Sequence, residues 1–180
     1  ENLTYRIDMN QGDVNMFEMF GDMKDELSIF PAQMQKLVLM AEQAYETTDS
    51  DRSVIRGSLE DIATKFYIEQ KMWFDNAKDN RDRLRVVDIP HEEVPKLETF
   101  VAYLDMEYKA ITNKTARDEE KVHALSILST TFKNLLSNNG DLFNTITNPT
   151  IDGVRDGRRV IYDFSQLMMR GRGVAMAKLV

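Results

Sequence analysis

The sequence of 180 residues contains no cysteine, and this absence excludes several kinds of chemistry. Without thiols, the chain has no disulfide, no cysteine nucleophile and no thiolate-bound metal. It also lacks a run of about eighteen apolar residues, the length that a membrane-spanning helix needs. We find no signal-peptide pattern at the start. These absences are typical of a protein in a reducing compartment, and we expect no insertion into a membrane.

The sequence motifs of common enzyme classes are missing as well. There is no phosphate loop of the form G-x-x-x-x-G-K-[ST], and therefore no glycine-rich cradle for a nucleoside triphosphate. G-x-S-x-G, H-E-x-x-H and a strand-linked G-x-G-x-x-G are also absent. The two histidines, His91 and His123, lack partners at metal-ligand spacing, and we interpret them as structural or surface residues. We predict that this chain is not an enzyme and holds no metal or cofactor.

Charge is distributed unevenly along the chain, whose net charge is −7. Residues 151–180 contain six basic and three acidic residues, so residues 1–150 are strongly acidic. An acidic body repels nucleic acid, whereas a basic end still offers a local contact. The candidate contact residues for DNA or a partner protein are four arginines of this end: Arg158, Arg159, Arg170 and Arg172. The alternative interpretation is that they are ordinary surface charges.

Two helices are predicted in the first half of the chain. Apolar residues recur at helical spacing over 34–47, after Pro31 at the first turn and Ser28 as an approximate cap. The segment 48–51 is expected to break this helix. Ser58-Leu-Glu-Asp61 has the form of a capping box, which predicts a second helix over residues 59–77.

Two further helices are predicted in the second half. Apolar residues form one stripe over residues 91–112, which indicates a third helix. Thr115-Ala-Arg-Asp118 has the form of another capping box and opens a fourth helix, which we expect to end at Asn138-Asn-Gly140. With 42% hydrophobic residues in the chain, there is enough apolar material for a packed core. The four helices therefore predict a compact helical subdomain.

The last stretch, residues 159–180, differs in character from the helical region. Val160-Ile-Tyr162 is a run of β-branched and aromatic residues, which favour strands. Asp163 and Ser165 follow at once, and both favour turns and helix N-caps. Residues 174–180 then form a new apolar segment. A strand, a polar turn and a helix in this order are typical of an α/β sheet.

A strand is also predicted at the start, where residues 3–9 alternate between apolar and polar side chains. Residues 13–21 contain several large apolar side chains, which we expect to cover a hydrophobic surface. Residues 141–156 are interpreted as a loop with apolar anchors at Leu142-Phe143 and Ile151. We expect the two strands to share one sheet, so that the helical body is an insertion between sheet strands.

The predicted fold class is mainly α, a compact bundle of about four helices with a short β element at each end. We divide the chain into a strand and lead-in segment (1–21), a helical subdomain (22–140), and a loop, strand and helix start (141–180). The eleven methionines, Met168-Met169 included, are interpreted as core filler. The apolar pattern reaches Val180 without a cap, and we expect the chain to be cut from a larger protein.

Three segments near the end follow one another in a recognisable order: Gly140-Asp-Leu-Phe143, Ile151-Asp-Gly153 and Arg159-Val-Ile-Tyr-Asp-Phe-Ser-Gln-Leu167. This order resembles a stretch of the large VirB/TraC-type ATPases of conjugation and type IV secretion. In that family a Gly-x-Leu-Phe loop leads into a core strand of the form V-x-x-D-x-S-x-L, and an all-α subdomain is inserted into a RecA-like core. Residues 5–17 resemble the segment that leaves the core before the insertion. Specific residues match only over 140–167.

This resemblance implies a non-catalytic helical subdomain of a conjugative-transfer ATPase that powers DNA or protein translocation. The parent protein would bind ATP and Mg²⁺, but those motifs lie outside this chain, so no catalytic residue is carried over. The implied partners are neighbouring subunits of a hexameric ATPase, other secretion or conjugation proteins, and DNA. The implied location is the cytoplasm, at the inner face of the cell membrane. The alternative is an independent helical module for protein interaction or regulation.

Overall fold

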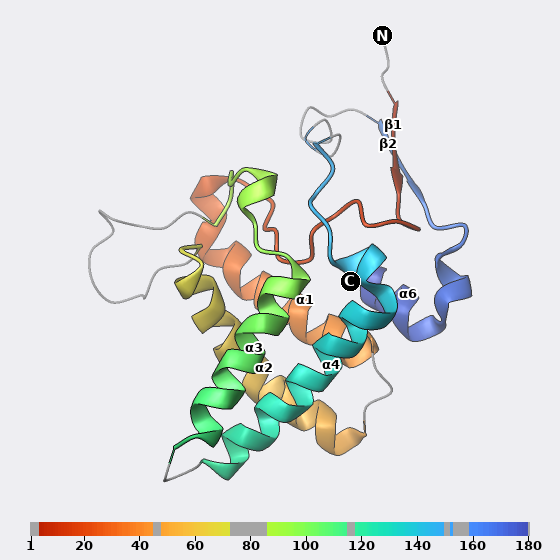
Figure 1. Cartoon of the computed structure of the whole chain (residues 1–180). Coiled ribbons are helices and arrows are strands. Elements are labelled where there is room, and N and C mark those ends of the chain that lie inside the picture. Colours follow the sequence, from red (N-terminus) through yellow and green to blue (C-terminus); the bar gives the residue numbers. More distant parts are fainter. Residues whose placement is uncertain are drawn as a thin grey trace.

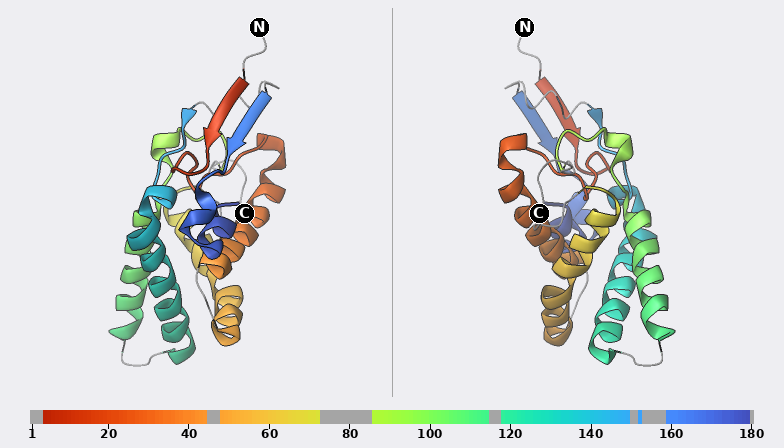
Figure 2. Two further views of the ribbon diagram at one scale, coloured as in Figure 1. Left: turned by 90° about the vertical axis from the view of Figure 1, so that its right-hand side faces the viewer. Right: turned by 90° about the vertical axis from the view of Figure 1, so that its left-hand side faces the viewer.

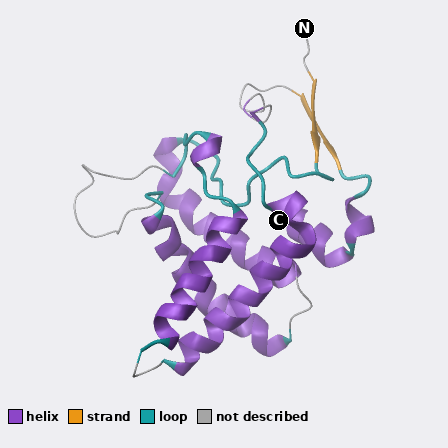
Figure 3. Ribbon diagram, in the orientation of Figure 1, coloured by secondary structure: helices purple, strands orange, loops and turns teal. Residues whose placement is uncertain are grey.

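The computed structural model describes residues 4–44, 48–72, 86–114, 118–149, 152 and 159–179. Helices make up most of these residues, and two short strands form one small sheet (Figure 1, Figure 3). The elements in chain order are β1 (Thr4–Asp8), η1 (Met23–Asp25), α1 (Glu26–Ala44), α2 (Asp49–Glu69), η3 (His91–Glu93), α3 (Leu97–Thr112), α4 (Glu119–Phe143), β2 (Arg159–Asp163), η5 (Leu167–Arg170) and α6 (Arg172–Leu179). The predicted fold class, mainly α with short β elements, is confirmed.

The helical body consists of two packed layers. Helix α3 runs along α4, and α1 runs along α2, while α2 also contacts α4 and joins the layers. Figure 2 shows the two layers edge-on, with the strand pair projecting from one end of the body. Helix α6 lies against α1. The segment after β2 is therefore packed onto the helical body.

Aromatic rings fill the centre of the helical body. Phe66 of α2 and Phe100 of α3 are fully buried, with their ring centroids 4.9 Å apart in an edge-to-face arrangement. Phe132 of α4 lies 5.0 Å from Phe100, and Phe17 of the lead-in segment lies 5.2 Å from it. Each such pair contributes about 0.5–1.5 kcal/mol beyond the burial of its area. The ring of Phe100 on α3 thus contacts rings from α2, from α4 and from the lead-in segment.

The lead-in segment covers the core, as its apolar side chains predict. Phe17 and Met19 are buried, although Phe20 at its end is exposed. Buried polar side chains hold this segment in place. The hydroxyl of Tyr67 donates to the carbonyl of Phe17 at 2.9 Å, and Nε2 of Gln33 donates to the carbonyl of Met16 at 2.8 Å. These bonds satisfy backbone groups of a segment that has no regular structure.

Buried Asn15 joins the lead-in segment to two other parts of the chain. Its Nδ2 donates to the carbonyl of Pro95 at 3.1 Å, and its backbone N donates to Oγ1 of Thr147 at 2.9 Å. Gly12 lies close to the backbone of α4, because a Cβ at this position would lie 2.6 Å from the carbonyl oxygen of Asp141. Only glycine fits there without a shift of the backbone.

Helix α1 begins earlier than the sequence indicated. The 3-10 turn η1 runs directly into Glu26, and Pro31 lies inside the helix instead of at its start. Ser28 is not the cap, because its hydroxyl donates to the carbonyl of Asp25 at 2.8 Å. Pro31 is exposed and has no backbone N–H to donate to the carbonyl of Leu27, one turn earlier in the helix.

The predicted start of the second helix is wrong by ten residues. Helix α2 begins at Asp49, in the segment that was expected to be a break. Thr48 and Asp51 form a complete capping box, in which N of Asp51 donates to Oγ1 of Thr48 at 3.1 Å and N of Thr48 donates to Asp51 at 3.4 Å. Ser58 lies inside the helix. The helix also ends earlier than predicted, at Glu69, although residue 77 itself lies outside the described residues.

The third predicted helix is divided in two. The short turn η3 is followed by Val94 in an extended conformation, and α3 begins only at Leu97. Pro95 explains this interruption, since a proline disfavours the helical conformation of the residue before it.

Helix α4 differs from its prediction at both ends. Its N-cap is Asp118, whose carboxylate accepts from N of Lys121 at 3.1 Å, whereas Thr115 lies outside the described residues. The predicted stop is only a kink, where Asn139 leaves the helical conformation (φ −140°, ψ 29°) and the helix resumes to Phe143. Leu142 and Phe143 are buried, as expected for apolar anchors, but they lie in this last turn and not in a loop. The other anchor, Ile151, lies outside the described residues.

The two strands share one sheet, as predicted, and they pair in parallel. Thr4 lies opposite Arg159 and Asp8 lies opposite Asp163, without a bulge between them. The whole helical body therefore connects two neighbouring strands of a parallel pair (Figure 1).

Candidate functional site

An acidic residue ends each strand of the sheet, and this carboxyl end is the first candidate site. Asp163 of β2 is bonded to the guanidinium of Arg6 on β1. This bond holds the pKa of Asp163 well below its usual range and raises the pKa of Arg6. N of Ser165 donates to Oδ1 of Asp163 at 2.9 Å, which is the turn that the sequence predicted for these two residues. Asp163 is thus an ionised carboxylate with a structural role.

Asn10 connects the ends of the two strands. Its backbone N and its Nδ2 donate to Oδ1 of Asp8 at 2.9 and 2.8 Å. Its Oδ1 accepts from N of Gln166 at 2.7 Å, in the segment between β2 and η5. N of Asp8 in turn donates to Oδ2 of Asp13 at 3.0 Å. The acidic side chains at this edge are therefore engaged in turns and bridges, and they do not converge on an open position.

The structure describes the side chains of two of the four predicted contact arginines, Arg170 and Arg172. Arg170 of η5 pairs with Asp141 through two bonds of 2.6 and 2.9 Å, which lower the pKa of Asp141. Arg172 begins α6 and is exposed. The backbone of Arg159 begins β2, but its side chain is not described, and Arg158 lies outside the described residues. The proposed contact of these four arginines with DNA or a partner stays a prediction.

Exposed apolar side chains lie beside these arginines, in the segment from β2 to η5. Ile161 and Tyr162 are 53% and 49% exposed, and the ring of Tyr162 stacks on that of exposed Phe164. Met168 and Met169 are 60% and 85% exposed. The interpretation of this methionine pair as core filler is wrong, because the turn η5 directs only Leu167 into the core.

Apolar side chains of β2 are exposed on both faces of the sheet. Successive residues of a strand point to opposite faces, so exposed Ile161 and Tyr162 lie on different faces of the sheet. Parallel sheets are normally covered on both faces and their strands are buried. On the neighbouring strand, Ile7 is buried. The strand β2 therefore has apolar surface of the kind that a further strand or helix covers.

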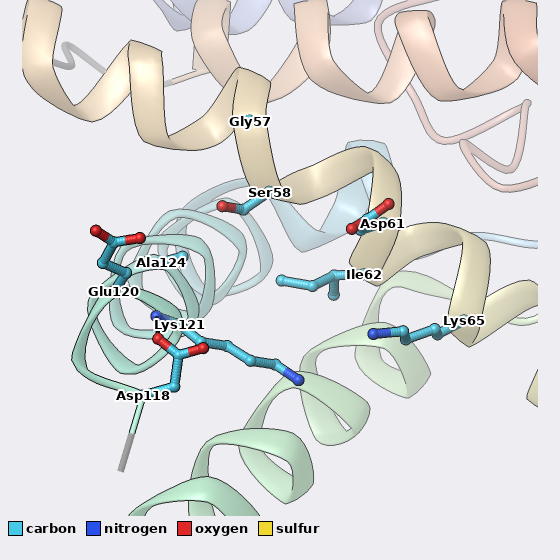
Figure 4. A pocket seen from close by; sticks show the side chains of 9 residues that line it. All are labelled: Gly57, Ser58, Asp61, Ile62, Lys65, Asp118, Glu120, Lys121 and Ala124. Carbon is cyan, nitrogen blue, oxygen red and sulfur yellow. Dashed lines mark hydrogen bonds between the residues drawn. The ribbon is translucent and has the colours of Figure 1, made fainter.

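A hollow of about 250 Å³ separates the middle of α2 from the start of α4 (Figure 4). Charges of both signs line it, from Asp61 and Lys65 on one helix to Glu120 and Lys121 on the other. Asp118, on the same wall, already caps α4. The mixed charges and the absence of a buried catalytic pair among these lining residues indicate a solvated groove between helices.

His91 joins the lead-in segment to residue 152. Its Nδ1 lies 2.7 Å from Oε1 of buried Glu18, and its Nε2 lies 3.2 Å from Oδ2 of Asp152. Desolvation opposes a charge on the ring, but the two carboxylates outweigh it and raise the pKa of His91. These contacts support the structural role predicted for His91, and no local sequence signal points to Glu18. His123 is exposed on α4.

Metal binding and membrane insertion find no support in the described part of the chain. Among these residues, no three His, Cys, Asp or Glu side chains are arranged to hold a metal ion. Nor does any described helix combine the length and apolar character needed to cross a membrane. Comparison of the chain with protein-family models, curated proteins and solved structures gives no match.

Proposed function

We propose that this chain is the non-catalytic helical subdomain of an ATPase of conjugation or type IV secretion, located at the cytoplasmic face of the cell membrane. In this proposal ATP and Mg²⁺ bind elsewhere in the parent protein. The helical body contributes contacts to neighbouring subunits, to other secretion proteins or to DNA. The order of residues over 140–167, which resembles that family, supports the proposal from the sequence.

The strand pair is the observation that carries this proposal. Two parallel strands without further neighbours are marginal in water, since a stable sheet needs more strands or a covering layer. Here β1 precedes the helical body in the chain and β2 follows it, and β2 exposes Ile161 and Tyr162. Both features are expected of a subdomain inserted between adjacent strands of a larger parallel sheet.

The test compares ATP hydrolysis by this chain with hydrolysis by a longer protein that includes the flanking sequence of the same gene. We expect no hydrolysis by the isolated chain and measurable turnover by the longer protein. In the longer protein, Tyr162→Asp should reduce turnover by at least about tenfold, because it places a charge on a covered sheet face.

A matched variant serves as the control for that substitution. Met106 of α3 is 51% exposed on the helical body, and Met106→Asp should leave turnover unchanged. Turnover by the isolated chain, or no nucleotide binding by the longer protein, would contradict the proposed function.

The alternative function, an independent interaction module, is favoured by one observation. Helix α6 packs against α1 and buries Ala175 and Ala177, so the segment after β2 belongs to the folded body. This alternative predicts that Tyr162→Asp has no effect on any ATP turnover by the longer protein. The two proposals therefore differ in the outcome of the same variant.

A further inference from the structure

Another hollow, of about 260 Å³, lies where α6 meets α1 and the lead-in segment. Its walls are mainly apolar and include Met16, Met40, Phe143 and Leu179. Two lysines are the only charged residues among its described lining, Lys36 from α1 and Lys178 from α6. An apolar hollow with a few convergent polar groups is the usual form of a small-molecule site.

Lys178 is held at the edge of this hollow. Its Nζ donates to the carbonyl of Leu142 at 2.9 Å and lies 5.6 Å from the ring centroid of Phe143. Burial lowers the pKa of Lys178 to about 8, the carboxylate of Asp13 opposes this shift, and the charge of Lys36 adds to it. The ammonium group is therefore positioned by a carbonyl and a ring, and it has no carboxylate in direct contact among the described residues.

Lys36 has fewer partners still. Burial lowers the pKa of Lys36 to about 8, and the charge of Glu18 offsets this only in part. No described residue accepts a hydrogen bond from its Nζ or forms an ion pair with it. Glu18 is bonded to His91 through Oε1, its Oε2 is buried without a hydrogen-bond partner, and Asp13 accepts from N of Asp8. Neither carboxylate forms a direct ion pair with a lysine of the hollow among the described residues, and the charge of Lys36 acts against that of Lys178.

We propose that this hollow binds a small carboxylate with an apolar chain, of the medium-chain fatty-acid type. The carboxylate lies between Lys36 and Lys178, and the chain lies against Met16, Met40 and Leu179. An anion at this position compensates two half-buried ammonium groups that repel each other. The lysine ammonium group is a compact point charge, which can pair with a single carboxylate. This inference does not depend on the proposed function.

The charge requirement is tested with three ligands that share one alkyl chain. Binding of octanoate, 1-octanol and octylammonium to the full chain is measured by isothermal titration calorimetry and by NMR shift perturbation. We expect octanoate to bind at least about tenfold more tightly than octanol, and octylammonium not to bind. Propionate should bind at least about tenfold more weakly than octanoate, because it lacks the apolar chain.

The two lysines are tested by substitution with methionine, which keeps an unbranched side chain of similar length. Lys36→Met and Lys178→Met should each weaken octanoate binding by at least about tenfold. Lys109→Met, on the exposed surface of α3, should leave it unchanged. Because Lys178 also bonds to Leu142, the fold of each variant is checked by circular dichroism, and Lys36→Met decides the question if Lys178→Met does not fold.

Equal affinity for octanol and octanoate would overturn the proposal, since the hollow would then be an apolar cavity without charge selection. Equal affinity of wild type and Lys36→Met for octanoate, or no binding of octanoate at all, would overturn it as well. Octanoate binding that both lysine variants weaken and that Lys109→Met leaves unchanged would support it.

Discussion

At the scale of single residues, the most informative side chains are buried polar ones that fix irregular backbone. Tyr67 is fully buried, and burial raises the pKa of its hydroxyl. The hydroxyl donates to the carbonyl of Phe17 and also accepts a bond from Gln33. It therefore connects α1 and α2 to the lead-in segment at the centre of the molecule.

Removing this hydroxyl tests that connection. Tyr67→Phe keeps the ring and leaves a buried carbonyl without its donor, so we expect the free energy of unfolding to fall by about 1–3 kcal/mol. Tyr162→Phe, at an exposed position, should change it by less than about 0.5 kcal/mol. Urea denaturation measures both variants. An equal effect of the two would show that the buried hydroxyl does not stabilise the lead-in segment.

The stability of the fold should depend on pH through His91. Glu18 and Asp152 contact its ring, and these residues line a hollow together with Asp88 and Glu92. Because the folded-state pKa of His91 lies above its ordinary value of 6.5, the protonated ring stabilises the fold. This contribution is complete below the ordinary value and is lost as the pH rises through the folded-state pKa.

The comparison of wild type with His91→Gln isolates this contribution. The difference in their free energies of unfolding should be larger at about pH 5.5 than at about pH 8.5. His123→Gln removes an exposed histidine and serves as the control. A difference that is constant over this range, or one that grows with pH, would contradict the assignment.

At the scale of elements, the sequence predicts the kind of element better than the residue at which a helix begins. The apolar stripes of the four helices and the alternation of the first strand follow from periodicity, so the kinds of element were predictable. Two segments, however, fit the capping-box pattern near α2, at Thr48 and at Ser58. The cap is at Thr48 because both of its bonds form there, whereas Ser58 lies inside the helix. A sequence pattern alone does not rank two such candidates.

Substitutions at the two candidate caps provide a direct check. Thr48→Ala removes the side chain that accepts from Asp51, and it should cost about 0.5–2 kcal/mol of stability. Ser58→Ala should have no cost or a small gain, because alanine favours a helix interior more than serine does by up to about 0.7 kcal/mol. Thermal or urea unfolding measures both. The opposite order of effects would mean that α2 begins near residue 59.

The candidate sites were less predictable than the elements. His91 meets Glu18 across 73 positions of sequence, and Lys36 and Lys178 reach one hollow from the two ends of the chain. Such pairs depend on how helices and loops pack, and hydrophobic periodicity reports only which face of an element is buried. The exposure of Met168 and Met169 was missed for the same reason, since composition does not show which side of a short turn faces the core.

At the scale of the whole molecule, the central feature is a difference in burial. The helical body has a packed hydrophobic core, whereas the sheet leaves apolar side chains exposed. The helical body has a continuous aromatic core that joins α2, α3, α4 and the lead-in segment. Within the described residues the sheet has two strands, and β2 exposes apolar residues in succession. The proposed function accounts for this contrast, because a parallel core supplied by the parent protein would cover the strands and leave the helices outside.

Amide hydrogen exchange at the strand pair tests this account most directly. It compares the amides of Ile7 and Ile161 in the isolated chain and in the longer protein of the same gene. The account predicts fast exchange at both strands in the isolated chain and strong protection in the longer protein, with α3 and α4 equally protected in the two. Equal protection of the strands in both proteins would contradict it, since the pair would then be a complete element of an independent module.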